Sequence, residues 1–132
     1  MDDSGIYALL IHCPGCRIRV GALGELEFAA GYYVYIGSAQ RNMNQRIERH
    51  KRREKKMRWH IDYLLQCARI VDVHSVAASK ECEEWVACKL AETHKFVRGF
   101  GASDSHVPSH LFYGPKEHLW NDVISVMKRC ER

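Results

Sequence analysis

The stretch that decides the fold is Tyr32-Tyr33-Val34-Tyr35-Ile36, which Gly37 closes. Aromatic and β-branched residues dominate it, as they do in buried strands. Upstream, residues 5–12 (GIYALLIH) have the same apolar character. We therefore predict strands over 5–12 and 32–36. If the chain between them folds back as hairpins, Tyr7 and Tyr35 lie on neighbouring strands.

Further elements follow outward from these two strands. Pro14-Gly15 is a turn signal between the first strand and Arg17–Val20, which predicts a hairpin. The remaining pattern predicts extended chain over 24–30, a helix capped by Asn42, a short helix over 59–65, a strand over 70–76, a helix from a Ser79 cap to about His94, a strand over 110–113 and a helix over 116–129. Because few strands alternate with helices, we expect an α+β fold with a small, mostly antiparallel sheet flanked by helices.

Length and composition predict one domain over residues 1–132. The chain is 46% hydrophobic and 27% charged, which excludes a disordered or low-complexity chain. Its apolar runs are far shorter than the roughly 20 residues that span a bilayer. The acidic start, Met1-Asp2-Asp3, is unlike a signal peptide. We expect a soluble cytoplasmic protein without a membrane partner.

Six cysteines are present, and two of them form the motif Cys13-Pro14-Gly15-Cys16. Without an export signal they are expected as thiols rather than disulfides. A structural zinc site usually takes four ligands from two such pairs, and there is no second Cys-x-x-Cys. We interpret the motif as a turn, and metal or redox chemistry stays open as the alternative.

Positive charge is concentrated in one segment. The whole chain has a formal net charge of +4, but residues 41–58 hold nine Lys and Arg against two Glu, which is +7. Such a concentration is typical of proteins that bind a polyanion such as nucleic acid, although a solvated basic helix would look the same. The residues expected to make sequence-independent phosphate contacts are Arg41, Arg49, Lys51, Arg52, Arg53, Lys55 and Lys56. Arg46, His50 and Arg53 are spaced to form one stripe of a helix.

Two tripeptides in order, Gly5-Ile6-Tyr7 and Tyr35-Ile36-Gly37, carry a family resemblance. Arg46 follows nine residues after Gly37, and glutamates lie on a later helix. The chain resembles the GIY-YIG nuclease superfamily, and its 27-residue spacer, longer than is typical there, resembles the DUF123 branch, which has an extra hairpin at this point. Further stretches similar to that branch are 17–21, 33–39, 49–50, 59–64, 100–104 and 109–111. At Ser105 and Val107 the branch tends to have cysteines.

The resemblance implies roles for four residues. Tyr7 matches the general base, Tyr35 orients water or phosphate, Arg46 stabilises the transition state, and His50 holds a phosphate oxygen or relays a proton. A phenol with an ordinary pKa of about 10 acts as a base only where nearby positive charge lowers that pKa. The alternative is that both tyrosines are half-buried strand residues with hydrogen-bonded hydroxyls.

The resemblance also implies a metal-binding glutamate, matched best by Glu83 and next by Glu84. A single carboxylate suits Mg²⁺, or Mn²⁺ in its place. The alternative is that Glu81, Glu83 and Glu84 complement the dipole of a helix N-terminus. We expect a metal-dependent endonuclease that hydrolyses DNA phosphodiesters, or else a nucleic-acid-binding module on the same scaffold without useful catalysis.

Two polar stretches are assigned to structure rather than catalysis. His60 and Asp62 are expected to hydrogen-bond to each other within a packing segment. Ser103, Asp104, Ser109 and His110 are expected to line a cleft or to order their own loop.

Overall fold

The computed structural model describes residues 3–102 and 106–132. Its strands are β1 (Gly5–Cys13), β2 (Cys16–Arg19), β3 (Glu25–Phe28), β4 (Gly31–Ala39), β5 (Arg69–Val76), β6 (Lys95–Phe96) and β7 (Leu111–Tyr113). Its helices are α1 (Met43–Lys51), α2 (His60–Leu64), α3 (Glu81–Thr93) and α4 (Lys116–Lys128), with a 3₁₀ turn over Gly21–Leu23. Within the described ranges, every helix is too short or too polar to pass through a bilayer.

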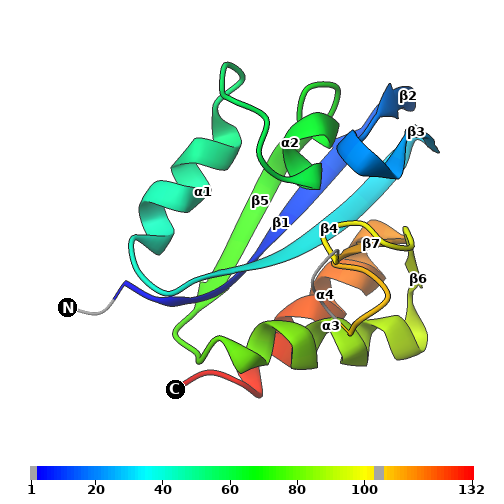
Figure 1. Cartoon of the computed structure of the whole chain (residues 1–132). Helices are drawn as coiled ribbons and strands as arrows, with labels where there is room; N and C mark the ends of the chain where they lie inside the picture. Colours follow the sequence, from blue (N-terminus) through cyan, green and yellow to red (C-terminus); the bar gives the residue numbers. More distant parts are fainter. Residues whose placement is uncertain (1–2, 103–105) are drawn as a thin grey trace.

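The main sheet has the strand order β5-β1-β4-β7-β6, and each neighbouring pair is antiparallel. Figure 1 shows α1 and α2 on one side of this sheet and α3 and α4 on the other. The α+β fold class predicted from the sequence, with a small antiparallel sheet flanked by helices, is confirmed.

The predicted hairpin between the first strand and Arg17–Val20 is wrong. Both sides of β1 are already occupied, by β4 and by β5, so β2 has no edge of β1 to pair with. Instead β2 pairs with β3 as a separate two-stranded sheet, with Cys16 opposite Phe28 and Arg19 opposite Glu25. This β2–β3 hairpin lies between the two tripeptides, where an extra hairpin was expected.

The central strands are buried on both faces, and the alternation of side chains divides the core in two. On one face, Leu9 and Ile11 of β1 pack with Met43 and Ile47 of α1 and with residues of α2 and the β2–β3 hairpin. On the other face, the intervening residues of β1 pack with α3 and α4. The strand contributes Ile6, Ala8 and Leu10, α3 contributes Val86 and Leu90, and α4 contributes Leu119 and Val123. Each face therefore needs its own covering layer.

Helix α1 begins where it was expected, but another residue satisfies its first amides. Asn42 precedes the helix with φ of +56° and makes no side-chain cap. Asp3 accepts the hydrogen bonds of these amides instead. Its carboxylate accepts one from Asn44 N at 3.1 Å, and its main-chain carbonyl accepts one from Met43 N at 3.0 Å. The helix ends at Lys51, so Arg53 lies beyond it and the predicted three-residue stripe is incomplete. Similarly, α3 begins at Glu81 after Lys80, one residue later than the predicted Ser79 cap implies.

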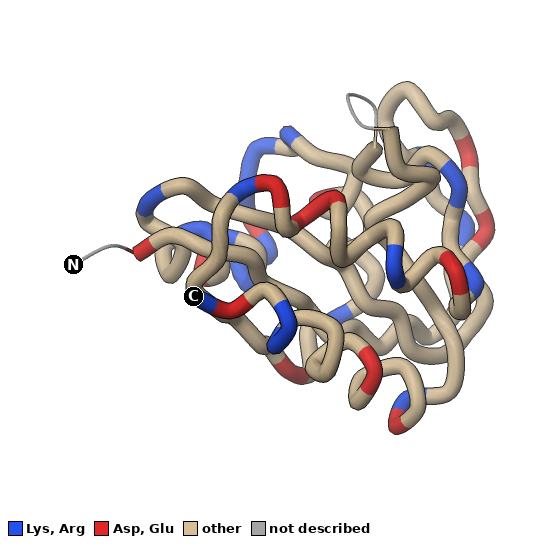
Figure 2. Tube along the Cα trace, turned by 90° about the horizontal axis from the view of Figure 1, so that it is seen from below, with Lys and Arg blue, Asp and Glu red and all other residues tan. Residues whose placement is uncertain are grey.

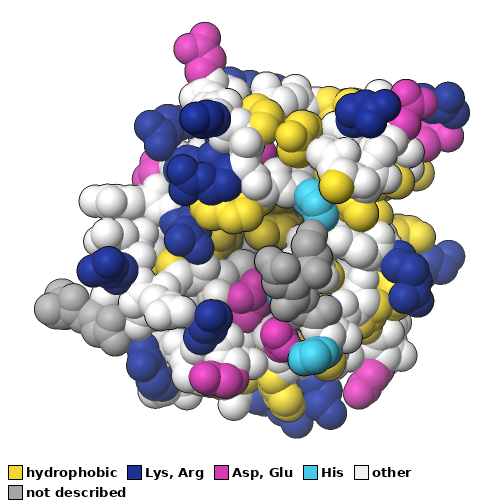
Figure 3. All heavy atoms as spheres, viewed as in Figure 1, with side chains coloured by type: hydrophobic (Ala, Val, Ile, Leu, Met, Phe, Trp, Pro, Cys, Tyr) yellow, Lys and Arg dark blue, Asp and Glu magenta, His cyan; other side chains and the backbone are white. Residues whose placement is uncertain are grey.

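Basic side chains gather over α1 and the segment that follows it, on the left of the space-filling view (Figure 3). Seen from below, acidic and basic residues are mixed along the rest of the trace (Figure 2). The positive charge that is concentrated in residues 41–58 of the sequence is therefore also concentrated in one region of the folded protein.

Candidate functional site

Tyr7 and Tyr35 lie on adjacent strands and on the same face of the sheet. In the β1–β4 register, Tyr7 is opposite Gly37 and Leu9 is opposite Tyr35, so the two tyrosines are diagonal neighbours. Both belong to the core that α1 and α2 cover. Both are buried, which raises the pKa of each above its ordinary value, against the opposing effect of Arg46. Neither phenol is therefore ionised at neutral pH in the free protein.

His50, from the last turn of α1, contacts both tyrosines. Its Nε2 lies 2.8 Å from the Tyr7 hydroxyl, and its ring centroid is 6.1 Å from that of Tyr35. Burial, reinforced by the charge of Lys55, lowers the pKa of His50 from 6.5 to about 4. The imidazole is thus neutral at pH 7 and can accept a hydrogen bond from the Tyr7 hydroxyl. Its buried Nδ1 has no hydrogen-bond partner within the described part of the chain.

Steric crowding by Tyr7 explains why residue 37, the last of the second tripeptide, is a glycine. A Cβ on residue 37 would lie 2.5 Å from Cζ of Tyr7 and 2.6 Å from its hydroxyl oxygen. Only glycine leaves room for the phenol in this position. The two tripeptides are therefore one packing unit across the β1–β4 pair.

Arg46 reaches the same place from the middle of α1. Its NH1 donates to the Ser38 carbonyl at 2.7 Å, and its guanidinium lies 5.1 Å from the centroid of the Trp59 ring. Its charge and hydrogen bonding act on Tyr7 to favour the phenolate. A fixed guanidinium beside a phenol can neutralise negative charge that develops there.

Glu83 approaches from α3, on the other side of the sheet. The Ser38 hydroxyl donates to one carboxylate oxygen of Glu83 at 2.5 Å, and Nδ1 of His110 lies 3.3 Å from the other. The same His110 nitrogen is 3.2 Å from the Ile36 carbonyl. The final residues of β4 thus join Glu83, from α3, to Arg46, from α1.

Of the three glutamates at the start of α3, only Glu83 is placed among these groups. It is partly buried, and its negative charge raises the pKa of Tyr7. Glu81 is exposed, and its pKa is lowered by hydrogen bonds from its own backbone and from Ser79. The helix-dipole alternative therefore suits Glu81, whereas Glu83 has contacts that a helix end does not require.

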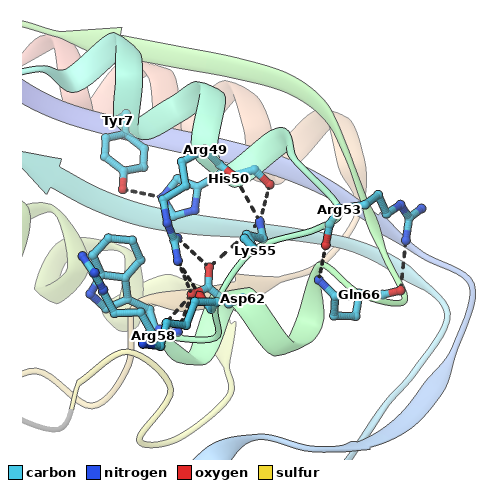
Figure 4. Close-up of polar contacts among 10 residues, drawn as sticks. Tyr7, Arg49, His50, Arg53, Lys55, Arg58, Asp62 and Gln66 are labelled. Atoms are coloured by element: carbon cyan, nitrogen blue, oxygen red, sulfur yellow. Dashed lines mark hydrogen bonds and ion pairs between the residues drawn. The ribbon is translucent and has the colours of Figure 1, made fainter.

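The basic segment is held by a buried carboxylate, that of Asp62 in α2. Asp62 accepts from both terminal nitrogens of Arg49, at 3.0 and 3.2 Å, and from the Arg58 and Trp59 amides at 2.8 and 2.9 Å. Figure 4 shows the side chains of Arg49 and Lys55 directed towards Asp62, with the main chain of Arg58 beside it. Burial alone would raise the pKa of Asp62, but the hydrogen bonds from Arg49 and the two amides keep it below its ordinary value. The predicted His60–Asp62 bond is wrong: His60 Nδ1 instead accepts from Gly101 N at 2.8 Å.

The predicted phosphate-contact residues divide into two groups. Lys55 is 3% exposed and donates to the carbonyls of Arg49 and His50 at the end of α1, while Arg49 is 17% exposed and bound to Asp62. Arg53 is exposed, although its NH1 donates to the Gln66 carbonyl at 2.9 Å. The other exposed members are Arg41, Lys51, Arg52 and Lys56. Arg49 and Lys55 thus organise the segment, and the exposed group gives it its outward charge.

Trp59 connects this segment to the tyrosines. Its ring has the guanidinium of Arg49 at 4.7 Å and that of Arg58 at 5.6 Å, in addition to that of Arg46, and its centroid is 5.7 Å from that of His50. Cation–π contacts of this kind orient guanidinium groups. Trp59 therefore fixes the direction of the arginines around the site.

Sequence reasoning missed the part that Ser38 and His110 play. His110 was expected in a cleft wall or a self-ordered loop, but its partners are Glu83 and β4. Ser109 does order its own loop, through bonds with the Leu111 amide and carbonyl. Ser103 and Asp104 lie outside the described residues. The signal that could have found His110 is its place directly before a short apolar strand, in a stretch already singled out.

Comparison with known proteins gives one match. A family model described as "Domain of unknown function DUF123" matches residues 6–132. No curated protein matches the chain, and no solved structure does. Both tripeptides and the residues they bring together lie almost entirely within the matched range, which covers nearly the whole sequence. The chain belongs to the DUF123 family.

Proposed function

We propose that this protein is a divalent-metal-dependent endonuclease of the GIY-YIG type, acting on DNA. The observation that carries the proposal is the convergence of Tyr7, Arg46, His50 and Glu83. They come from β1, α1 and α3, on both sides of the sheet, yet they meet around the end of β4. A fold needs no such meeting of a phenol, a guanidinium, an imidazole and a carboxylate. Phosphodiester hydrolysis needs these kinds of group.

The residues fit a metal ion of the Mg²⁺ class. Glu83 and Ser38 offer hard oxygen donors, and Mg²⁺ usually takes one or two protein carboxylates and fills its other positions with water and phosphate oxygens. Glu83 would hold the ion, which when bound would supply positive charge at the scissile phosphate. Mn²⁺ suits the same donors.

The chain's own residues would act as follows. His50, neutral at pH 7, accepts a hydrogen bond from the Tyr7 hydroxyl through the 2.8 Å contact and so orients the phenol. Tyr7 takes a proton from water only as the phenolate, which positive charge such as that of Arg46 favours. Arg46 stabilises negative charge at Tyr7 and at the phosphate. Tyr35, a diagonal neighbour of Tyr7, positions the water or the phosphate.

DNA would lie across the basic segment, with Arg41, Lys51, Arg52, Arg53 and Lys56 facing its phosphates. A second candidate function is DNA binding without turnover on the same surface. One observation favours it: burial keeps Tyr7 and Tyr35 protonated in the free protein.

Nicking of supercoiled plasmid separates the two candidates. With Mg²⁺ or Mn²⁺ the wild type should nick, and a chelator should stop it. Arg46→Ala should reduce the rate about 10²–10³-fold, since it removes one preorganised stabilising group. Glu83→Gln should abolish nicking, whereas the matched variants Glu81→Gln and Glu84→Gln should retain it.

Tyr7→Phe tests the base directly, because it removes one hydroxyl and leaves the ring against Gly37. It should abolish nicking and leave DNA affinity nearly unchanged. Equal trace rates in wild type and Glu83→Gln would favour DNA binding without turnover. If Glu84→Gln alone lost activity, the metal ligand would be Glu84 and not Glu83.

A further inference from the structure

Cys13 and Cys16, neighbours in sequence, meet the distant Cys67 at one corner of the molecule. Cys13 ends β1, Cys16 begins β2, and Cys67 follows α2; their sulfur atoms all lie within 4.8 Å of one another. Cys13 is buried with a free thiol, whereas Cys16 and Cys67 form a disulfide, so the expectation of thiols is wrong for these two residues. Among the described residues, this is the only group of three or more His, Cys, Asp or Glu whose ligand atoms come so close. It shares no residue with the site around Tyr7.

The geometry at Cys13 and Cys16 is that of a metal knuckle. Zinc–sulfur bonds of about 2.3 Å in a tetrahedral site place neighbouring sulfurs roughly 3.8 Å apart. The Sγ atoms of Cys13 and Cys16 are 3.7 Å apart. The amide of Gly15 donates to the Cys13 sulfur at 3.4 Å, which holds this sulfur against the turn. The Pro14-Gly15 turn therefore presents two sulfurs to one point.

The surroundings supply space and compensating charge. A cavity of about 160 Å³ beside Cys67 is lined by Arg53 and Arg69, together with His12, Pro14 and Ala68. A divalent ion held by three thiolates has a net charge of −1, and the two arginines that line the cavity are positively charged. The cavity also leaves room for a small fourth ligand such as water.

We propose that Cys13, Cys16 and Cys67 form a three-thiolate site for Zn²⁺, which fills when the Cys16–Cys67 bridge is reduced. Two electrons and two protons from a thiol reductant open the bridge, leaving three thiols and the reductant's disulfide. Zn²⁺ then replaces three thiol protons, which leave to solvent. The ion ties the corner between β1 and β2 to α2, the helix whose Asp62 holds Arg49. Soft thiolate ligands select Zn²⁺ over Mg²⁺, so the site is distinct from the one at Glu83.

Co²⁺ is the probe for the test. The full chain is reduced with a phosphine, freed of reductant without oxygen and titrated with Co²⁺. One ion per chain should bind with intense sulfur-to-cobalt charge-transfer absorption, release about three protons, and be displaced by Zn²⁺. The unreduced protein should not show this absorption.

Serine variants assign the ligands. Cys16→Ser and Cys67→Ser alter partly exposed residues, and circular dichroism verifies their fold. Each should weaken Co²⁺ binding at least about tenfold, the smallest loss seen even for residues that only support a ligand. Cys88→Ser and Cys130→Ser, cysteines elsewhere in the chain, should leave binding unchanged.

Three results overturn the proposal. The first is a reduced wild type without charge-transfer absorption. The second is undiminished binding in Cys16→Ser and Cys67→Ser. The third is a bridge that stays closed under the phosphine, seen by mass spectrometry as two sulfurs that resist alkylation.

Discussion

Gly37 lies opposite Tyr7 in the β1–β4 pair, so close that a Cβ on residue 37 would be 2.5 Å from the phenol carbon Cζ. This contact links the two tripeptides physically, and it makes residue 37 as much a part of the site as the tyrosine. The Tyr7 hydroxyl is in turn 2.8 Å from His50 Nε2. Any shift of the ring is therefore passed on to α1.

Gly37→Ala should destabilise the protein by about 1–3 kcal/mol, because an added methyl group in a packed position forces its neighbours to move. The expected movement is a displaced Tyr7 ring and a longer Tyr7–His50 contact. Urea unfolding measures the free energy. Gly114→Ala is the matched control, since a Cβ there would meet nothing within 4 Å, and it should be nearly neutral. Equal stability of the two variants would contradict the packing account.

Asp62→Asn should cost about 3–5 kcal/mol of stability, because it leaves the Arg49 charge partly buried without its partner. Lys55, whose pKa is already lowered by burial, loses an opposing charge as well. Glu54→Gln is the control: it removes one negative charge from an exposed residue of the same segment and should change stability little. Urea unfolding of the two variants at one pH distinguishes them.

The Asp62 contribution should also depend on pH. Its folded pKa is below the ordinary value, so its stabilisation is present at neutral pH and is lost as the pH falls through that folded pKa. Wild type and Asp62→Asn should therefore converge in stability on acidification. A constant difference down to strongly acidic pH would show that the carboxylate charge is not what matters.

His50 should make the protein less stable in mild acid. Its pKa is about 4 when folded and 6.5 when exposed, so the unfolded chain binds more protons between these values and stability falls as the pH drops through them. The loss should reach roughly 3 kcal/mol. In His50→Gln the pH dependence over this range should shrink by about that amount, while His118→Gln, an exposed histidine on α4, should retain it.

If DNA binds the basic segment, the exposed residues alone should set the salt dependence. Lys51→Gln, Arg52→Gln and Lys56→Gln should each reduce the slope of log K against log salt by about 0.9, the loss of one phosphate contact. Lys128→Gln, on α4, should leave the slope unchanged. Fluorescence titration of a labelled duplex at several salt concentrations gives the slopes. A flat salt response in the wild type would exclude the nucleic-acid interface.

The sequence predicted the strands and helices well because their apolar periods are strong. The strands around Tyr7 and Tyr35 lie where the pattern placed them, and α4 begins at the expected residue. Strand pairing was harder. Proximity along the chain favoured pairing of β1 with β2, but β1 is flanked by β4 and by β5, which is far away in sequence.

For the candidate site, local sequence patterns identified the residues but not the side chains that each of them contacts in the folded protein. That Arg49 and Lys55 face inward depends on Asp62, and a basic residue bound to a buried carboxylate looks the same in sequence as one facing solvent. The contact between Glu83 and His110 spans two segments that only the sheet brings together. The meeting of Cys67 with Cys13 and Cys16 is of the same kind, since nothing near Cys67 in sequence marks it as their neighbour.

The position of Glu83 on the opposite layer from Arg46 has a consequence for biosynthesis. Tyr7, Arg46 and His50 all leave the ribosome before α3 is made, and His110 follows later still. A nascent or truncated chain can thus present its basic segment without the carboxylate that completes the constellation. The incomplete polypeptide could bind a polyanion but would hold only part of the proposed catalytic apparatus, and the whole of it would exist only once α3 had been translated and packed.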